Sequence, residues 1–184
     1  NLPPGFKIQV YATNLNGVRW LGLSPEGVVD LPVRGDGRVV TLKDSNSDGV
    51  VDEVTTFAEN VGAVQGIDFH HGAVYVANEG QIIRLQDTNN DGKADKRDVL
   101  ADDLPTGSGH STRTIAFGPD GNLFISIGDR NDNGVRPWDV AQRLDTDLGK
   151  IIHITPDGAP APDNPLLGKP GILPEIWAYG VRSP

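Results

Sequence analysis

The chain has 184 residues, of which 37% are apolar, and a net charge of −9, so it suits one domain with a sizeable core. Its acidity argues against nucleic acid or an anionic membrane as the main partner, and no apolar run approaches the ~20 residues that a membrane-spanning helix needs. The absence of cysteine excludes a disulfide framework and thiol chemistry.

Three units of strand, tight turn and strand recur along the chain. They are GLSPEGVV from Gly22, DFHHGAVYVA from Asp68 and AFGPDGNLFISIGD from Ala116. Their turn glycines, Gly27, Gly72 and Gly121, lie 45 and 49 residues apart, and a further strand follows each unit (RVVTLKD, QIIRLQD and GKIIHITPDG). A period in the forties with several strands per repeat and Gly-rich turns predicts β-propeller blades. Residues 1–184 are therefore expected to form a single, all-β, partial propeller domain.

An acidic phrase, Asp-x-Asn-x-Asp-Gly-x-x-Asp, occurs twice. Its oxygens and its glycine match the start of an EF-hand loop, which predicts Ca²⁺. The expected ligands are Asp44, Asn46, Asp48, Val50 (carbonyl) and Asp52 in the first loop, and Asp87, Asn89, Asp91, Lys93 (carbonyl) and Asp95 in the second. An EF-hand loop has a glutamate ligand at its twelfth position. Here that position is Thr55 in the first loop and Asp98 in the second, so the carboxylate of Asp98 makes the second loop the better site. A polar hairpin that needs no ion is the alternative.

The segment GSGHSTRTIAFGPDGNLFISIGDRND, from Gly107, is the part most typical of a reaction centre. His110 is expected to enter a strand through a Gly-rich loop, with Arg113 on the same strand, and Asp129 to follow the next strand. Two antiparallel strands joined by GPDG bring those ends together, so an Asp–His pair is available, and such a pair fixes the imidazole tautomer that a general base requires. The alternative is a histidine that caps a loop and an aspartate that closes a turn, and spacing alone favours it.

Several stretches resemble the glucose/sorbosone dehydrogenase family: LPPGFKIQVYA, HSTRTIAFGPDGNLFISIGDRND, QRLDTDLGKIIHITPDG, APDNPLLGK and PEIWAYGVRSP. The resemblance implies a six-bladed propeller that uses pyrroloquinoline quinone (PQQ), of which this chain would supply about three and a half blades. It implies that His110 takes the proton of a sugar hydroxyl or hydrated aldehyde as a hydride passes to the quinone, that Asp129 orients His110, and that Arg182 contacts the cofactor. Ser183 replaces the asparagine of the family's Arg-Asn-Pro.

PQQ carries carboxylates, so an acidic chain must bring cations to it, and Arg113, Arg130 and Arg182 are the candidates. Gln65 is expected to open an inner strand that faces the channel. Trp138 and Trp177 are expected to pack between blades, and His153, on an apolar strand, is expected to be structural.

The resemblance also implies a sugar substrate and an electron acceptor, either a quinone or a cytochrome. Family members are roughly twice as long, so we expect a portion of a longer protein, or a half completed by a second half-propeller or another copy. The chain begins at Asn1 and lacks methionine, so we expect that a leader has been removed or that the start is missing. A processed secretory signal, and with it a periplasmic or secreted location, is the expected case. Two other functions stay open: a calcium-dependent lactonase-type propeller, in which a central metal activates water, and a propeller that only binds or scaffolds.

Overall fold

The computed structural model describes residues 2–107, 109–130 and 139–184, and this part of the chain is almost entirely β-structure. Its strands are β1 (Gly22–Leu23), β2 (Val29–Val33), β3 (Arg38–Lys43), β4 (Glu53–Ala58), β5 (Gly66–His70), β6 (Ala73–Ala77), β7 (Ile82–Gln86), β8 (Lys96–Ala101), β9 (Ile115–Phe117), β10 (Leu123–Ile127), β11 (Lys150–Ile154) and β12 (Ile176–Tyr179). A short 3₁₀ turn, η1 (Val140–Gln142), is the one helical element in the described residues. No helix there is long or apolar enough to cross a membrane.

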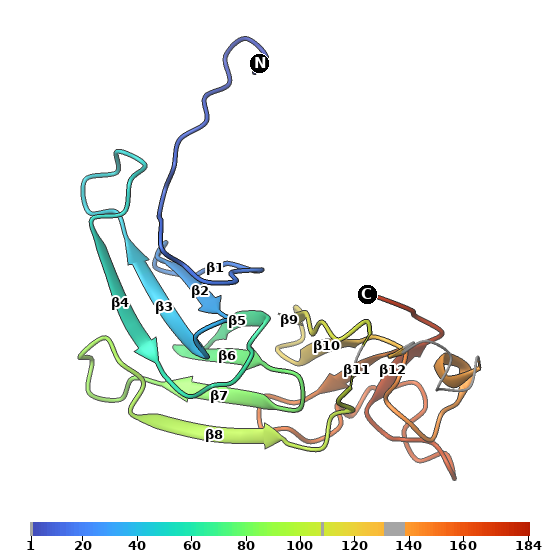
Figure 1. Cartoon of the computed structure of the whole chain (residues 1–184). Coiled ribbons are helices and arrows are strands. Elements are labelled where there is room, and N and C mark those ends of the chain that lie inside the picture. The colour runs from blue at the N-terminus through green and yellow to red at the C-terminus, as the bar shows by residue number, and fades with distance from the viewer. Residues whose placement is uncertain (1, 108, 131–138) are drawn as a thin grey trace.

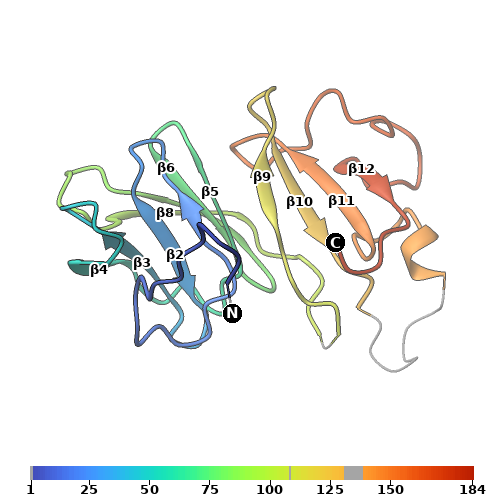
Figure 2. The ribbon, with the colours of Figure 1, turned by 90° about the horizontal axis from the view of Figure 1, so that it is seen from above.

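The strands form three four-stranded antiparallel sheets, in the orders β1-β2-β3-β4, β5-β6-β7-β8 and β9-β10-β11-β12. Every strand pairs with its neighbour in sequence, so each sheet is a simple meander, and the sheets stand side by side like a fan (Figures 1 and 2). The first strands lie together, because β5 contacts both β1 and β9. This confirms the propeller prediction, with three sheets in place of the expected three and a half.

Strand β6 shows how the sheets pack. Ala73, Tyr75 and Ala77 belong to a cluster shared with the third sheet, whereas Val74 and Val76 belong to a cluster shared with the first. Successive side chains on a strand point to opposite faces, so alternate residues of β6 enter two different interfaces. All five are buried, because the second sheet is covered on both faces.

The free face of the first sheet is covered by the chain's own N-terminal segment. Tyr11, Leu15 and Val18 pack against a cluster formed by the apolar residues of β2 and β3. The residues before them extend away from the sheets (Figure 1). Phe6 and Ile8 on that segment are 69% and 83% exposed, so its apolar side chains have no cover within the described residues.

The meander gives the sheets two chemically different ends. We call the first the His110 end; it holds the β2–β3, β4–β5, β6–β7, β8–β9 and β10–β11 connections and the residues after β12. The second, the acidic end, holds the β1–β2, β3–β4, β5–β6, β7–β8, β9–β10 and β11–β12 connections. Figure 2 shows the two for the third sheet, with the β8–β9 loop at the bottom and the β11–β12 loop at the top.

Candidate functional site

At the His110 end the structure brings His110 and Asp129 into contact, with Nδ1 of the imidazole 2.5 Å from Oδ1 of the carboxylate. His110 lies in the loop before β9, not on the strand as expected, because β9 begins only at Ile115. The pairing with β10 continues to Thr114, whose carbonyl accepts from the amide of Ser126 (2.9 Å), and this sets the two loop ends side by side. The side chains of His110 and Asp129 are 26% and 16% exposed, so the pair is accessible from solvent.

The close approach of the two loops depends on Gly128, which the sequence reasoning missed. A Cβ at this position would lie 2.7 Å from Cβ of His110 and would collide with its carbonyl oxygen. His110 itself has a φ of 38°, a left-handed conformation that is costly for a residue with a side chain. The glycine directly before Asp129 in the SIGD segment was the available signal for a tight backbone crossing.

The residues after β12 return to the same place. The amide of Asp129 donates to the carbonyl of Arg182 (2.9 Å), and the amide of Val181 donates to the carbonyl of Gly149 (3.1 Å). The side chain of Arg182 is exposed. The structure therefore brings three of the residues singled out in the sequence, His110, Asp129 and Arg182, to one point.

Arg113 and Arg130 are both buried, at 1% and 0% exposure. Arg113 donates to the carbonyls of Glu79 (3.0 Å) and Pro105 (2.5 Å). Arg130 donates to the carbonyls of Pro105 (2.8 Å) and Gly107 (2.7 Å) and to the carboxylate of Glu79 (3.1 Å). Burial and the neighbouring Arg130 lower the pKa of Arg113 to about 10. Both guanidinium groups hold the loop that carries His110. Nε and Nη1 of Arg113 make no hydrogen bond within the described residues, and contact of Arg113 with the cofactor stays a prediction.

Glu79 is a second residue that the sequence reasoning missed. It lies on the β6–β7 connection, and its carboxylate also accepts from the amide of Gly107 (2.9 Å). It therefore ties the second sheet to the β8–β9 loop.

Two further expectations concern how far the side chains of Gln65 and Trp177 are exposed. Gln65 does lie just before β5 but is only 6% exposed, so it offers no side chain to a surface ligand. Trp177, on β12, is 38% exposed and its ring packs edge-on against Phe124 and His153, and its packing between blades stays a prediction. Trp138 lies outside the described residues.

At the acidic end the two repeated loops occupy equivalent connections, β3–β4 and β7–β8, and share one hydrogen-bond scheme. The two carboxylate oxygens of Asp44 accept from the amides of Asp48 (3.2 Å) and Gly49 (2.9 Å). Asp87 accepts from the amides four and five residues on in the same way (3.2 and 2.8 Å). The ligand types and the backbone shape thus suit a hard cation, although backbone amides already satisfy these carboxylates.

Asp98 is not part of the second loop. It lies on β8, opposite Arg84 on β7, which donates to its carboxylate through two nitrogens (3.0 and 3.1 Å). This partner holds the pKa of Asp98 below its usual value. Because β8 begins at Lys96, the twelfth position of the pattern falls within a strand, and the expected ligand role of Asp98 is wrong.

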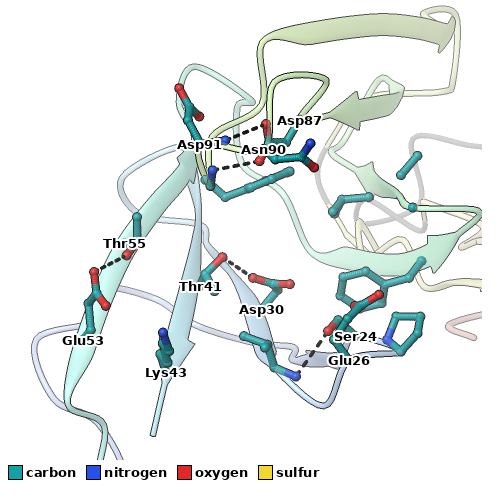
Figure 3. Close-up of a pocket in the computed structure, with 18 residues that line it drawn as sticks. Ser24, Glu26, Asp30, Thr41, Lys43, Glu53, Thr55, Asp87, Asn90 and Asp91 are labelled. Atoms are coloured by element: carbon teal, nitrogen blue, oxygen red, sulfur yellow. Dashed lines mark hydrogen bonds between the residues drawn. The ribbon is translucent and has the colours of Figure 1, made fainter. Parts of the chain in front are cut away.

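A cavity of about 670 Å³ lies at the acidic end between the first and second sheets (Figure 3), and its lining does not include His110. Asp87 and Asp91 of the second acidic loop line one side, and Asp30, Thr41 and Lys43 line the other. Thr41 donates to Asp30, and burial raises the pKa of that carboxyl. The cavity is therefore rich in carboxylates, unlike a site built for an anionic cofactor.

Comparison with known proteins identifies the family. The sequence pattern of the Glucose / Sorbosone dehydrogenase family matches residues 36–184. The chain is 40% identical over 81 residues to the aldose sugar dehydrogenase YliI of Escherichia coli, a match that covers 44% of this chain and 20% of that protein. The HIPL1 protein of Arabidopsis thaliana is 34% identical over 104 residues, covering 48% of this chain and 15% of that protein.

Solved structures agree with the fold. An oxidoreductase (glucose dehydrogenase) from Thermus thermophilus superposes with a TM-score of 0.72 at 30% identity and covers 92% of this chain and 53% of its own. The PQQ-bound aldose sugar dehydrogenase of Streptomyces coelicolor gives 0.73 at 25% identity, with 96% and 54% covered. The chain thus spans about half the length of these solved relatives. On the match over residues 36–184, the chain belongs to the glucose/sorbosone dehydrogenase family.

Proposed function

We propose that this chain carries the proton-transfer site of a PQQ-dependent sugar dehydrogenase, in which His110 acts as general base. The observation that carries the proposal is the contact between Nδ1 of His110 and the carboxylate of Asp129, 2.5 Å apart and accessible from solvent. A carboxylate can only accept here, so Nδ1 donates its proton to Asp129. The other ring nitrogen, Nε2, then presents a lone pair that can take a proton.

The described residues fit the quinone in part. Arg182 is exposed beside the pair and can meet a carboxylate of the cofactor, whereas Arg113 and Arg130 are buried and donate to backbone carbonyls. When bound, the quinone supplies the acceptor for the hydride of the sugar. The chain's own contribution is to hold Nε2 of His110 ready for the hydroxyl proton, while Asp129 keeps the tautomer and balances the charge of the imidazolium.

The test replaces His110 by alanine in the complete propeller and measures turnover of an aldose at saturating PQQ, with quinone occupancy read separately from its absorbance. A positioned base contributes 10²–10⁴-fold, so turnover should fall at least a hundredfold while occupancy is kept. His71→Ala is the matched control, because His71 also has a positive φ (47°) but lies at the acidic end. Near-normal turnover of His110→Ala at full occupancy would overturn the proposal.

Two further variants separate orientation from cofactor binding. Asp129→Asn should lose less turnover than His110→Ala, because it disturbs the tautomer but keeps the base. Arg182→Ala should weaken PQQ affinity more than turnover at saturation. A lactonase-type hydrolase would instead need a central metal, and the acid-rich loops and cavity lie at the opposite end of the sheets from His110.

A further inference from the structure

His153 is held in an arrangement that its structural role does not explain. It lies on β11 and is fully buried, and its ring stacks on Phe124 of β10, with centroids 3.9 Å apart and planes 11° apart. The edge of Trp177 closes a second side at 4.9 Å. These contacts fix the imidazole plane and leave its two nitrogens facing polar groups.

Asn164 decides which nitrogen carries a proton. Its amide nitrogen donates to two carbonyls, those of His153 and Pro174, both at 2.9 Å. The amide oxygen therefore faces Nδ1 of His153, 3.0 Å away, and can only accept. Nδ1 is the donor, so in the neutral imidazole Nε2 carries a lone pair.

That lone pair faces a carboxylate. Nε2 has no hydrogen-bond partner among the residues that the structure describes, although Oδ2 of Asp120 lies 3.0 Å away, which means that the two atoms are close but not aligned for a hydrogen bond. A lone pair and a carboxylate oxygen at this distance repel each other unless a positive charge lies between them. Two atoms that each bind one tetrahedral zinc-type ion at ~2.1 Å are themselves about 3.4 Å apart, so the 3.0 Å found has to widen by a few tenths of an ångström to admit the ion.

A second carboxylate completes the set. One oxygen of Asp120, one of Asp163 and one ring nitrogen of His153 lie within 4.8 Å of one another, and no other such trio occurs in the described residues. Oδ1 of Asp163 lies 3.6 Å from Nδ1 of His153, so this exposed side chain has to turn toward Nε2 to share an ion with Asp120. Asp120 comes from the β9–β10 turn and Asp163 from the β11–β12 loop, and both are exposed, which gives an ion a path from solvent. Metal-bound histidines commonly donate their other N–H to a carbonyl oxygen, as Nδ1 does here to Asn164.

We propose that Asp120, His153 and Asp163 bind a divalent cation of the zinc type at the acidic end of the third sheet. An imidazole nitrogen with two carboxylate oxygens suits zinc and its neighbours in the first transition series, whereas Ca²⁺ prefers six to eight oxygens. Three protein ligands leave a position for water. The ion would tie together a turn, a strand and the loop that follows that strand, and the site does not depend on the proposed dehydrogenase activity.

The test is calorimetric titration of the chelator-stripped chain with Zn²⁺. One equivalent should bind and raise the thermal midpoint. Asp120→Asn and Asp163→Asn should each weaken binding at least tenfold; both residues are exposed, so these variants should fold, whereas a variant of the buried His153 could fail to fold. Asp87→Asn is the control, because it removes a carboxylate of the second acidic loop and should leave Zn²⁺ binding unchanged.

Co²⁺ locates the ion. It should quench the fluorescence of Trp177, which lies 4.9 Å from the His153 ring, and Trp177→Phe should remove that quenching. Equal Zn²⁺ affinity in the native chain and Asp120→Asn would overturn the proposal. So would no binding at pH 8, which would leave His153 as a protonated ion pair, or Co²⁺ quenching that persists in Trp177→Phe.

Discussion

The two ends of the sheets use charge in opposite ways. At the His110 end, the buried guanidinium groups of Arg113 and Arg130 donate to backbone carbonyls and hold one loop in place. At the acidic end, carboxylates at equivalent connections accept from backbone amides of their own loop, as at Asp44 and Asp87. The first arrangement links distant segments and so builds a site, whereas the second is local and can recur wherever the same hairpin recurs.

The largest effect should come from the close approach at the His110 end. Gly128→Ala places a Cβ against His110, so the loop must move; we expect a cost of about 1–3 kcal/mol in unfolding free energy and a loss of turnover of tenfold or more. Gly72→Ala at the acidic end is the control, because its Cβ would meet nothing within 4 Å and only its φ of 74° is strained. Urea unfolding and turnover measure the two effects. Unchanged turnover in Gly128→Ala would show that the His110 end does not depend on this close approach.

The next effect concerns the acidic end, where calcium binding by the repeated loops stays a prediction. A cation that binds only the folded chain stabilises it by ~2.7 kcal/mol at a hundred times its dissociation constant. The thermal midpoint should therefore rise with millimolar Ca²⁺, and Asp44→Asn and Asp87→Asn should each reduce the rise. The same midpoint in excess chelator and in millimolar Ca²⁺ would show that the loops are polar hairpins.

Asp147, on the β10–β11 connection, should make the folding stability of the His110 end depend on pH. Burial, with Glu175 and Asp103 nearby, raises the pKa of Asp147 to about 7 from 3.8, against the opposing effect of Lys150. A raised carboxyl pKa favours folding at low pH, and this stability is lost as pH rises from about 4 to about 7. Asp147→Asn should therefore raise the unfolding free energy at pH 7.5 by about 2 kcal/mol, after allowance for partial exposure, and change little at pH 4. An equal gain at both pH values would show a packing effect instead.

The smallest effect should be seen at Glu79. Glu79→Gln keeps an acceptor for the amide of Gly107 but removes the charge that faces Arg130, so we expect a loss of about 1 kcal/mol and a few-fold decrease in turnover. Glu53→Gln on β4 is the matched control at the acidic end, where the carboxylate is exposed, and should change neither quantity. Equal effects of the two variants would remove the distinction between the ends.

Residue spacing predicted what depends on regular geometry. The turn glycines placed the hairpins, and the GPDG turn brought the His110 and Asp129 ends together, because the register of an antiparallel pair follows from its turn. Spacing could not show that Arg113 is buried and donates to the carbonyls of Glu79 and Pro105, since these contacts come from tertiary packing. Nor could it show that a strand begins before Asp98, or that Asp120 and Asp163 converge on His153 from two different connections.

The burial of β6 on both faces has a consequence for how the chain resists unfolding. Because each sheet pairs only within itself and touches only its neighbours, stability behaves as a sum of single-sheet and nearest-neighbour interface terms, as in repeat proteins. The second sheet belongs to both interfaces, and alternate residues of one strand serve each of them. Tyr75→Ala would therefore weaken the interface with the third sheet, whereas Val76→Ala would weaken the interface with the first. In each variant the single unfolding transition would separate into steps, and the sheet that unfolds first would depend on which face of β6 carries the substitution.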